Sequence, residues 1–432
     1  MRKSLPLVYL LAAVSVAGAQ SSAPPIMATL PSSITARAAA GDTPPLSLLQ
    51  VLDAAHRMNP TLLSGTEHAN AVRAGEVTAG LRQNPTAVLG GQMLSLGPND
   101  PNGPDFYQAG VQRLFERGNK REWRLQSARS TTALTVQQLA DQRRQTDLSV
   151  CQSFSRMLYA QADLDIAQQN LASYEKTVSL MKFRLGAGDM DRTDFDRVEL
   201  QLVGFENDAD NARLVLQQSS IALQTLIGVA APQEAFAIQG SLEPQTETLT
   251  LDELHNRAIQ ERPDLKAAQA QIDANAAGLK LAQANGTADP TLEGEYERSG
   301  NANSVGGSIN IPLRLFDRNQ GEKVRAQHEL ESSRLALIAT RNQVLADVDS
   351  SWAAYRTALG QDARYREKYL AEASSVRDNL EFSYRHGNST LLDYLSALSD
   401  YRQVNLAALN ARLQLLLAAE QLDAAAHIEV TP

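Results

Sequence analysis

Two long stretches of this sequence, residues 118–185 and 321–385, contain no proline and only three glycines. Both are expected to form long helices, because nothing in them interrupts a helical pattern. At 1.5 Å per residue, each helical arm would reach roughly 100 Å. A spacing of 3-4-3-4, which is typical of coiled-coil packing, joins the apolar residues Leu345, Val348, Trp352, Tyr355 and Leu359. A bridge across a wide compartment needs such arms, whereas a single globular domain does not.

The sequence contains an internal repeat of two copies. A shift of 203 residues superposes the start of one unit, residues 46–62, on residues 249–265. A shift of 199 residues superposes the ends of the arms, pairing Phe183, Gly188, Asp194 and Phe195 with Phe382, Gly387, Asp393 and Tyr394. We therefore expect two structural repeats, 46–248 and 249–426, followed by a tail over 427–432. Each repeat is predicted to run helix, strand, strand, long helix, tip, helix, with the tips at 186–192 and 386–391.

The N-terminus has the pattern of an export signal. Arg2 and Lys3 precede an apolar run over residues 5–16, and small residues lead to a cleavage site between Ala19 and Gln20. The apolar run is too short to span a membrane as a helix, so residues 1–19 are predicted to be a signal peptide. Residues 20–45 are rich in Pro, Ala, Ser and Thr without periodicity, which predicts a flexible leader.

Period-two alternation follows Pro85 and Pro290, where the preceding helical stretches are expected to stop. It predicts one pair of strands within residues 86–114 and another within 291–315. In the second pair, one face carries Glu293, Glu295 and Glu297, and the other carries Leu292, Gly294 and Tyr296. Each strand has roughly the 9–11 residues that a tilted strand needs to cross a bilayer. The connections at 97–105 and 300–303 are expected on the extracellular side, because both arms must share the other side.

Four strands cannot close a barrel by themselves, and open strand edges are not tolerated in lipid. A barrel with a water-filled lumen needs well over eight strands. Four strands from each of two chains would give eight, and four from each of three would give twelve, so a homotrimer is the better physical solution. In such a barrel, Glu293, Glu295 and Glu297 would face the lumen and favour cations. A soluble sheet would show the same alternation, which is the alternative interpretation of this row.

Three motifs are the most informative: LRQNP at 81–85, GNKR at 118–121 and IPLRLFDRNQG at 311–321. In this order, the motifs and the duplicated layout resemble the TolC-type outer membrane efflux proteins over about residues 46–420. The resemblance is strongest to the branch that serves heavy-metal exporters of the resistance-nodulation-division class. It implies a mainly α fold with a transmembrane β-barrel portion, in which a trimer forms a 12-strand barrel in the outer membrane and a long periplasmic α-helical barrel.

The resemblance also implies partners and a site. The chain would be a passive exit duct, joined at its tips to a periplasmic membrane-fusion adaptor and an inner-membrane resistance-nodulation-division pump. The tip residues that would contact the adaptor are Gly186, Gly188, Asp189, Met190 and Arg192 in the first repeat and Gly387, Asn388, Ser389, Thr390 and Leu391 in the second. Metal cations, drugs and organic solutes remain open as cargo.

A resting gate at the same tips is the second implication. Tyr384 and Asp393 match the gate tyrosine and aspartate of the family, and Asp194 is the counterpart of Asp393 in the first repeat. Ser389 and Ser396 stand where the best-known member carries an arginine and a second aspartate, so the network cannot be copied whole. Arg385 and Arg192 are possible partners of Asp393. The alternative is that Asp393 only caps the helix after the tip.

Other functions have little support in the sequence. With 40 basic and 49 acidic residues, the chain is unsuited to nucleic acid or anionic membrane surfaces as main partners. The six histidines show no metal-ligand spacing, so neither a metal site nor a cofactor is expected. Cys151 is the only cysteine and is predicted to be a buried thiol. No catalytic motif is visible, and the main alternative to a duct is a periplasmic coiled-coil adaptor without its own barrel.

Overall fold

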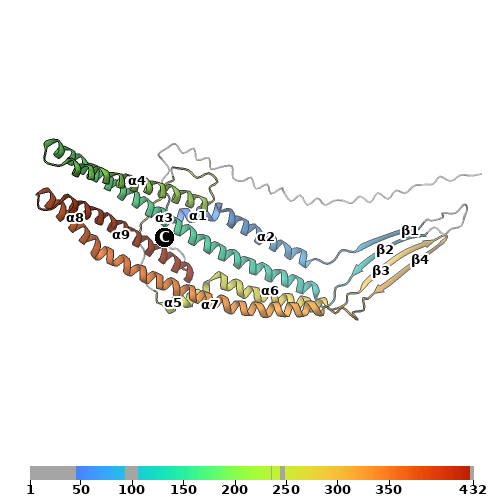
Figure 1. Ribbon diagram of the computed structural model, residues 1–432. Coiled ribbons are helices and arrows are strands. Elements are labelled where there is room, and N and C mark those ends of the chain that lie inside the picture. Colours follow the sequence, from blue (N-terminus) through green and yellow to red (C-terminus); the bar gives the residue numbers. More distant parts are fainter. Residues whose placement is uncertain (1–44, 93–105, 235, 244–248, 429–432) are drawn as a thin grey trace, which may run out of the picture. The chain divides into compact units, whose positions relative to one another are not determined.

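The computed structural model describes residues 45–92, 106–234, 236–243 and 249–428 (Figure 1). The signal peptide, the leader and the connection at 97–105 lie outside the described residues, so the expectations about them stay predictions. The fold class is confirmed: long helices make up most of the described chain, and they are accompanied by one small antiparallel sheet. Within the described residues, no helix combines the length and the apolar character required to cross a membrane.

In both halves of the chain the elements follow the predicted order, except that two consecutive helices precede the strands where one was predicted. The first half contains α1 (Leu48–Met58), α2 (Pro60–Gly80), β1 (Thr86–Gln92), β2 (Phe106–Leu114), α3 (Lys120–Ala187) and α4 (Arg192–Ile227). The second half contains α5 (Leu251–Glu261), α6 (Pro263–Asn285), β3 (Thr291–Ser299), β4 (Ala302–Asn310), α7 (Gln320–Arg364), the π-helical turn η1 (Tyr365–Tyr369), α8 (Leu370–Arg385) and α9 (Leu391–Ala426). The π turn was not predicted, and it divides the second arm into α7 and α8.

The first helices of each half begin on clear sequence signals. Ser47 and Thr250 form capping boxes at the starts of α1 and α5, and Pro60 and Pro263 occupy the first turns of α2 and α6. Both α2 and α6 end before the prolines that were expected to stop them. Gly80 is the last residue of α2, and Gly286 follows α6. Glycine has a low helix propensity, so the chain is already extended when it reaches Pro85 and Pro290.

The sheet has the strand order β1-β2-β3-β4, and every neighbouring pair is antiparallel. Pairing of β2 with β3 joins the two halves of the chain. The turn between β3 and β4 is shorter than predicted: Gly300 adopts a φ of 62°, and β4 begins at Ala302. The last strand also ends early, at Asn310 rather than near residue 315. Pro312 explains this, because it lacks the N–H that a strand ladder needs.

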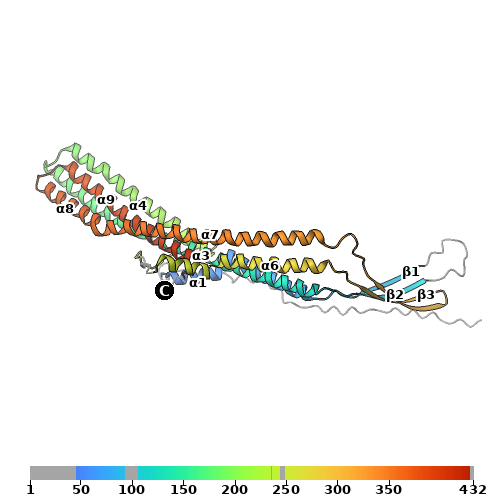
Figure 2. The same ribbon diagram turned by 90° about the horizontal axis from the view of Figure 1, so that it is seen from below.

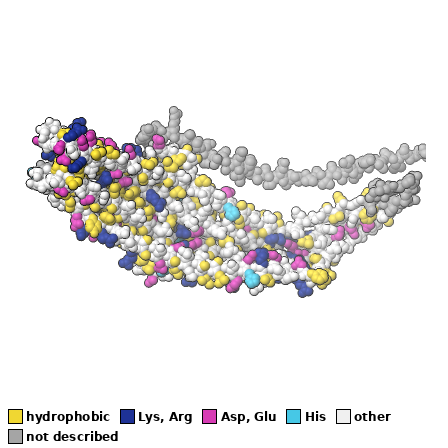
Figure 3. Space-filling model, viewed as in Figure 1, with side chains coloured by type: hydrophobic (Ala, Val, Ile, Leu, Met, Phe, Trp, Pro, Cys, Tyr) yellow, Lys and Arg dark blue, Asp and Glu magenta, His cyan; other side chains and the backbone are white. Residues whose placement is uncertain are grey.

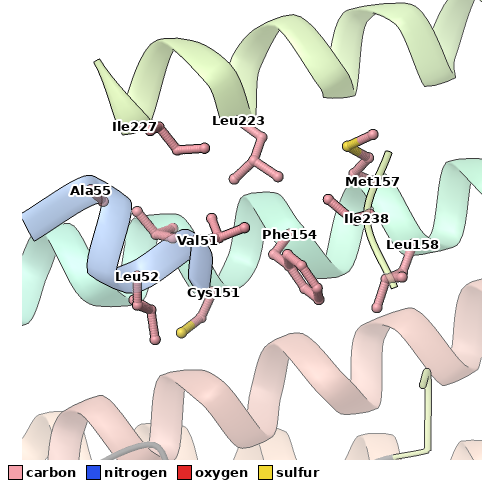
Figure 4. Packing of buried hydrophobic residues seen from close by; sticks show 11 residues of the cluster. Val51, Leu52, Ala55, Cys151, Phe154, Met157, Leu158, Leu223, Ile227 and Ile238 are labelled. Atoms are coloured by element: carbon pink, nitrogen blue, oxygen red, sulfur yellow. The ribbon is translucent and has the colours of Figure 1, made fainter. Parts of the chain in front are cut away.

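Each half has its own hydrophobic core. In the first, α1, α3 and α4 enclose Val51, Phe154 and Leu223, and Ile238 from the segment after α4 covers them (Figure 4). Cys151 lies in this core as predicted, and burial raises the pKa of its thiol to about 12. In the second half, α5, α7 and α9 form the equivalent core.

The phase of the predicted seam on α7 was partly wrong. The buried positions are Val344, Val348, Ser351, Tyr355, Ala358 and Asp362, whereas Leu345 is half-buried and Leu359 is exposed. The 3-4 spacing is right, but the seam centres on a different line of residues. In both halves the arm folds back on itself, because α4 packs along α3, and α9 packs along α7 and α8 (Figures 1 and 2).

Candidate docking and gating site at the helical tips

The first tip, between α3 and α4, reverses on a left-handed glycine. Gly188 has a φ of 81°, and its N–H donates to the carbonyl of Leu185 at 3.1 Å. The N–H of Asp189 donates to the carbonyl of Arg184 at 2.9 Å, so two of the last carbonyls of α3 are satisfied. Only open space surrounds the position where a side chain on Gly188 would begin. The demand for glycine here is therefore conformational and not steric.

The second tip, between α8 and α9, repeats this geometry. Gly387 has a φ of 76°, and its N–H donates to the carbonyl of Tyr384 at 3.1 Å. The N–H of Asn388 donates to the carbonyl of Ser383 at 2.8 Å. The two glycines that the 199-residue shift superposes thus end their arms in the same way.

Asp393 takes part in a capping box at the start of α9. Its carboxylate accepts hydrogen bonds from the Thr390 hydroxyl at 2.7 Å and the Thr390 N–H at 3.1 Å. In return, the Asp393 N–H donates to the Thr390 hydroxyl at 3.2 Å. The bonds from Thr390 lower the pKa of the Asp393 carboxyl. The capping alternative is thus present in the structure, with Thr390 as the N-cap residue, and the exposed carboxylate also stands at the positive end of α9.

Tyr384 connects three helices at the tips. Its ring stacks on Tyr394 with centroids 5.6 Å apart, and the guanidinium of Arg184 lies 5.6 Å from its centroid. Its hydroxyl donates to the sulfur of Met181 at 3.5 Å. Burial raises the pKa of Tyr384, while the charge of Arg184 opposes that rise. The predicted gate tyrosine therefore binds the second tip to the arm of the first repeat.

A shared hydrophobic cluster lies under both tips. Its buried members are Tyr174, Met181, Phe195, Val198, Phe205, Tyr394 and Leu395. The stacked rings of Tyr174 and Phe205, with centroids 4.4 Å apart, join α3 to α4. Sequence reasoning did not assign these residues to the site. The signal was nevertheless available, because Phe195 and Tyr394 are counterparts in the two repeats and both are buried here.

Other predicted tip residues are not brought together within the chain. The guanidinium of Arg192 contacts Asp196 at 2.9 Å, and Asp194 contacts Arg197 at 3.5 Å. Arg192 is therefore engaged with its own helix and not with Asp393. The hydroxyl of Ser389 donates to the carbonyl of Leu380 at 3.5 Å. The side chain of Arg385 lies outside the described residues.

At the opposite end of the arms, the sheet has two chemically different faces. Glu293, Glu295 and Glu297 share one face, as predicted, and the Gln108 amide donates to Glu295 at 2.6 Å. Their neighbours on β2 and β4 are small or polar: Gln112, Gly110, Gln108, Ser308, Gly306 and Ser304. The other face exposes apolar side chains, with Val305 85% and Ile309 65% exposed. Such a sheet suits a position between lipid and water.

The junction between the sheet and the arms is held by a buried ion pair. The ammonium of Lys120 lies 2.5 Å from Asp289 and also donates to the Thr287 carbonyl at 2.7 Å. Gly118 (φ 68°) and Asn119 (φ 55°), from the GNKR motif, adopt left-handed backbone angles. Before α7, the N-cap residue Asn319 makes no side-chain cap bond, and its amide donates to the Ala282 carbonyl at 2.7 Å. The Asp317 carboxylate accepts from the Asn319 N–H at 2.8 Å. Across the described ranges, no group of potential metal ligands is found.

Comparison with known proteins gives these features a context. Residues 106–229 and 254–426 match the family of outer membrane efflux proteins. The cobalt-zinc-cadmium resistance protein CzcC of Cupriavidus metallidurans is 25% identical over 90% of this chain and 90% of its own length. The outer membrane protein TolC of Vibrio cholerae is 22% identical over 87% of this chain and 89% of its own length. A crystal structure of CusC superposes with a TM-score of 0.74 at 18% identity, covering 88% of this chain and 91% of that one.

Proposed function

Because this chain belongs to the family of outer membrane efflux proteins, we propose that three copies of it build one exit duct of a tripartite export system. The chain is an outer membrane efflux channel, and it extends from that membrane into the periplasm. The proposal adds how many copies assemble, where the partners dock, where the duct closes and what it carries.

The observation that carries the proposal is the sheet with its two faces and two open edges. Among the described strands, β2 and β3 have neighbours on both sides, whereas β1 and β4 each have one. An apolar face beside a polar face with three carboxylates fits a wall between lipid and a water-filled lumen. Pairing of β4 of one chain with β1 of the next would close the wall, and three chains would supply twelve strands.

The tips are the proposed docking site for the periplasmic adaptor, which in turn would connect the duct to an inner-membrane pump of the resistance-nodulation-division class. In the part of the chain that the structure describes, the long arms reverse at Gly188 and Gly387. They are supported by one shared hydrophobic cluster, so a partner that moves one tip would also displace the other.

In the proposed resting state, Tyr384, Asp393 and Asp194 form a gate at the tips. Tyr384 ties α8 to α3, and this contact has to change if the second tip is to move away from the first. Asp393 is exposed in the first turn of α9, and Asp194 is half-exposed in the first turn of α4. Three chains would place these carboxylates in a ring, where mutual repulsion favours opening unless a cation or an arginine neutralises it.

Metal cations are the proposed cargo. The support is the name of CzcC, a cobalt-zinc-cadmium resistance protein, together with the Glu293, Glu295 and Glu297 row, which would favour cations in a lumen. Deletion of the gene should then lower the tolerated concentration of cobalt, zinc or cadmium, and the intact gene should restore it. An unchanged tolerance to all three metals, with changed tolerance to organic solutes, would reassign the cargo.

Paired cysteines test the assembly. In a Cys151→Ser background, one cysteine on β1 and one on β4 should form a disulfide only between chains, and complete oxidation should give a species of three chains on a denaturing gel. Paired cysteines on β2 and β3 provide the control, because those strands are neighbours within one chain. A ladder that stops at two chains would refute the trimer.

A further inference from the structure

The segment that leaves β4 exposes an unusual number of large apolar side chains. Leu313 is 79%, Leu315 63% and Phe316 91% exposed, and Ile311 before them is 53% exposed. A contiguous exposed patch of this kind marks an interaction surface in a protein that avoids aggregation. The patch lies between the last strand and the first turn of α7, at the junction of the sheet with the arms.

Strand register places this patch in line with the apolar face of the sheet. Leu114, Thr291 and Asn310 form one row across β2, β3 and β4, so residues 115–118 and 311–318 leave the sheet at the same end. In the next row, Leu292 pairs with Ile309, and both are exposed. The exposed apolar surface therefore continues from the sheet face into residues 311–316.

Basic side chains accompany the patch. At this end of the sheet the sequence places the arginines Arg82, Arg113, Arg117, Arg121, Arg314 and Arg318. Two nearby carboxylates already have cationic partners: Glu116 contacts Arg124 at 2.6 Å, and Asp289 contacts Lys120 at 2.5 Å. Within the segment, the Asp317 carboxylate accepts from the Asn319 N–H at 2.8 Å and is outnumbered by the arginines. Figure 3 shows hydrophobic and basic side chains next to each other where the arms meet the strands. The local charge is thus positive, although the chain as a whole carries −9.

We propose that residues 311–318 anchor the duct in the periplasmic leaflet of the outer membrane by binding an anionic phospholipid. Leu313 and Phe316 enter the acyl region, while Arg314 and Arg318 bind the headgroup phosphate. Amphipathic segments bind membranes through this combination of buried apolar area and basic charge. The inference rests on the proposed function, because it takes the apolar face of the sheet to be the lipid-facing wall.

A second copy of the chain is the competing occupant, because β4 is an open edge. The segment that would approach from a neighbour's β1 is the one before Thr86, and it carries Arg82. This would place like charges beside Arg314 and Arg318, which is unfavourable without a counter-ion. A phosphate between these arginines removes the repulsion, so the charges favour lipid.

Insertion is tested by fluorescence quenching. The Phe316→Trp variant, assembled in vesicles of phosphatidylethanolamine and phosphatidylglycerol, should lose most of its added emission when the acyl chains carry bromine. Leu335→Trp is the matched control, since Leu335 lies on α7 and is also exposed, at 63%. The unmodified chain provides the background of Trp123 and Trp352. If the added emission of Phe316→Trp resists bromine while the protein is a heat-stable trimer, the anchor is refuted and the duct is not.

Headgroup binding is tested with the trimer extracted from the same vesicles. Arg314→Gln combined with Arg318→Gln should reduce the retained phosphatidylglycerol roughly 25-fold, because each arginine near an anionic surface contributes about a factor of five. Arg334→Gln, on α7, should retain the unmodified amount. Equal retention in all variants would overturn the arginine assignment. If Phe316→Ser dissociates the trimer in lipid-free detergent, the patch is a subunit contact and the proposal fails. Absence of any trimer in the unmodified protein would instead refute the proposed function.

Discussion

The ring of Tyr384 lies parallel to that of Tyr394, with an interplanar angle of 5° and 5.6 Å between centroids. This pair joins the last turn of α8 to the first turn of α9 across the second tip. The Arg184 guanidinium also makes a cation–π contact with the Tyr384 ring, and the Tyr384 hydroxyl makes one long contact with the Met181 sulfur. Stacking and cation–π contacts each contribute on the order of 1 kcal/mol, so the ring matters more than the hydroxyl.

The gate proposal therefore predicts different effects for two substitutions. Tyr384→Ala should raise the conductance of the duct in planar bilayers, because it removes every contact between the second tip and α3 that this ring makes. Tyr384→Phe should leave the conductance close to that of the unmodified duct. Phe382→Ala serves as the control, since Phe382 is 63% exposed and lies outside the shared cluster. Equal conductance of Tyr384→Ala and the unmodified duct would remove Tyr384 from the gate.

The tip glycines offer a second prediction. Gly387→Val should destabilise the tip, because valine disfavours the left-handed φ of 76° that Gly387 adopts, at a cost of about 1–2 kcal/mol. Gly387→Asn should be milder, because asparagine tolerates the left-handed region. Export should fall with valine while the heat-stable trimer persists, as judged by gel migration and by cell survival. Gly360→Val is the control: its surroundings are equally open, but it lies inside α7. Loss of the trimer in Gly387→Val would assign this glycine to folding.

The period-two pattern predicted the strands well, because successive residues of a strand point to opposite faces of the sheet. Alternating polar and apolar residues therefore show which face each residue occupies. Glu293, Glu295 and Glu297 therefore share one face of the sheet, as predicted, and the lumen-facing orientation of that face stays a prediction. Helix phase was harder to predict, since an arm with apolar residues on several sides can bury more than one line of them. Val344 was missed as a seam residue because its burial depends on α5 and α9, which lie far away in the sequence.

Two further features depend on tertiary partners. Arg402 interrupts an apolar run on α9, and the structure shows why: its guanidinium pairs with Asp208 of α4 at 2.8 Å and lies over the ring of Phe205. The π turn η1 has no signal in its sequence, YREKY, although Tyr365 and Tyr369 contact each other edge to face. The capping box of Thr390 and Asp393, by contrast, is local, which is why sequence alone could offer it as an alternative.

We expect the stability of the fold to depend on pH through the carboxyl group of Glu420. Glu420 is half-buried between α9 and α3, where the Ser155 hydroxyl donates to one carboxyl oxygen. The other carboxyl oxygen is buried and has no hydrogen-bond partner. Burial raises the pKa of Glu420 to about 7, although the bond from Ser155 opposes this. Because the folded pKa lies above the ordinary value, the protonated form stabilises the fold below about pH 4.5. This contribution is lost as the pH rises through 7 and amounts to about 3 kcal/mol at most.

The melting temperature should accordingly fall between pH 5 and pH 8, and Glu420→Gln should flatten this fall. Circular dichroism at each pH provides the measurement. Asp393→Asn is a suitable control, since the pKa of Asp393 is lowered and its titration lies below this range. An identical pH profile in the unmodified chain and in Glu420→Gln would show that Glu420 does not titrate in this window.

The Lys120–Asp289 pair predicts a large loss of stability at the junction. Lys120→Met should destabilise the chain by about 2 kcal/mol, because it leaves the half-buried Asp289 carboxylate with only the Arg117 N–H as a donor. Arg325→Gln should change the stability far less, since its partners Glu322 and Glu329 are exposed and solvent screens the pairs. Urea titration of the helical signal can compare the two. Similar midpoints for both variants would contradict the importance of the buried pair.

The two open strand edges have a genetic consequence. If each duct needs β1 of one chain against β4 of the next, a copy with a damaged β4 can still offer an intact β1 and enter the assembly. In a cell that makes damaged and intact chains in equal amounts, random mixing into trimers leaves only about one duct in eight free of damage. Alleles with substitutions in β4 should therefore be dominant, whereas alleles that prevent synthesis of the chain should be recessive.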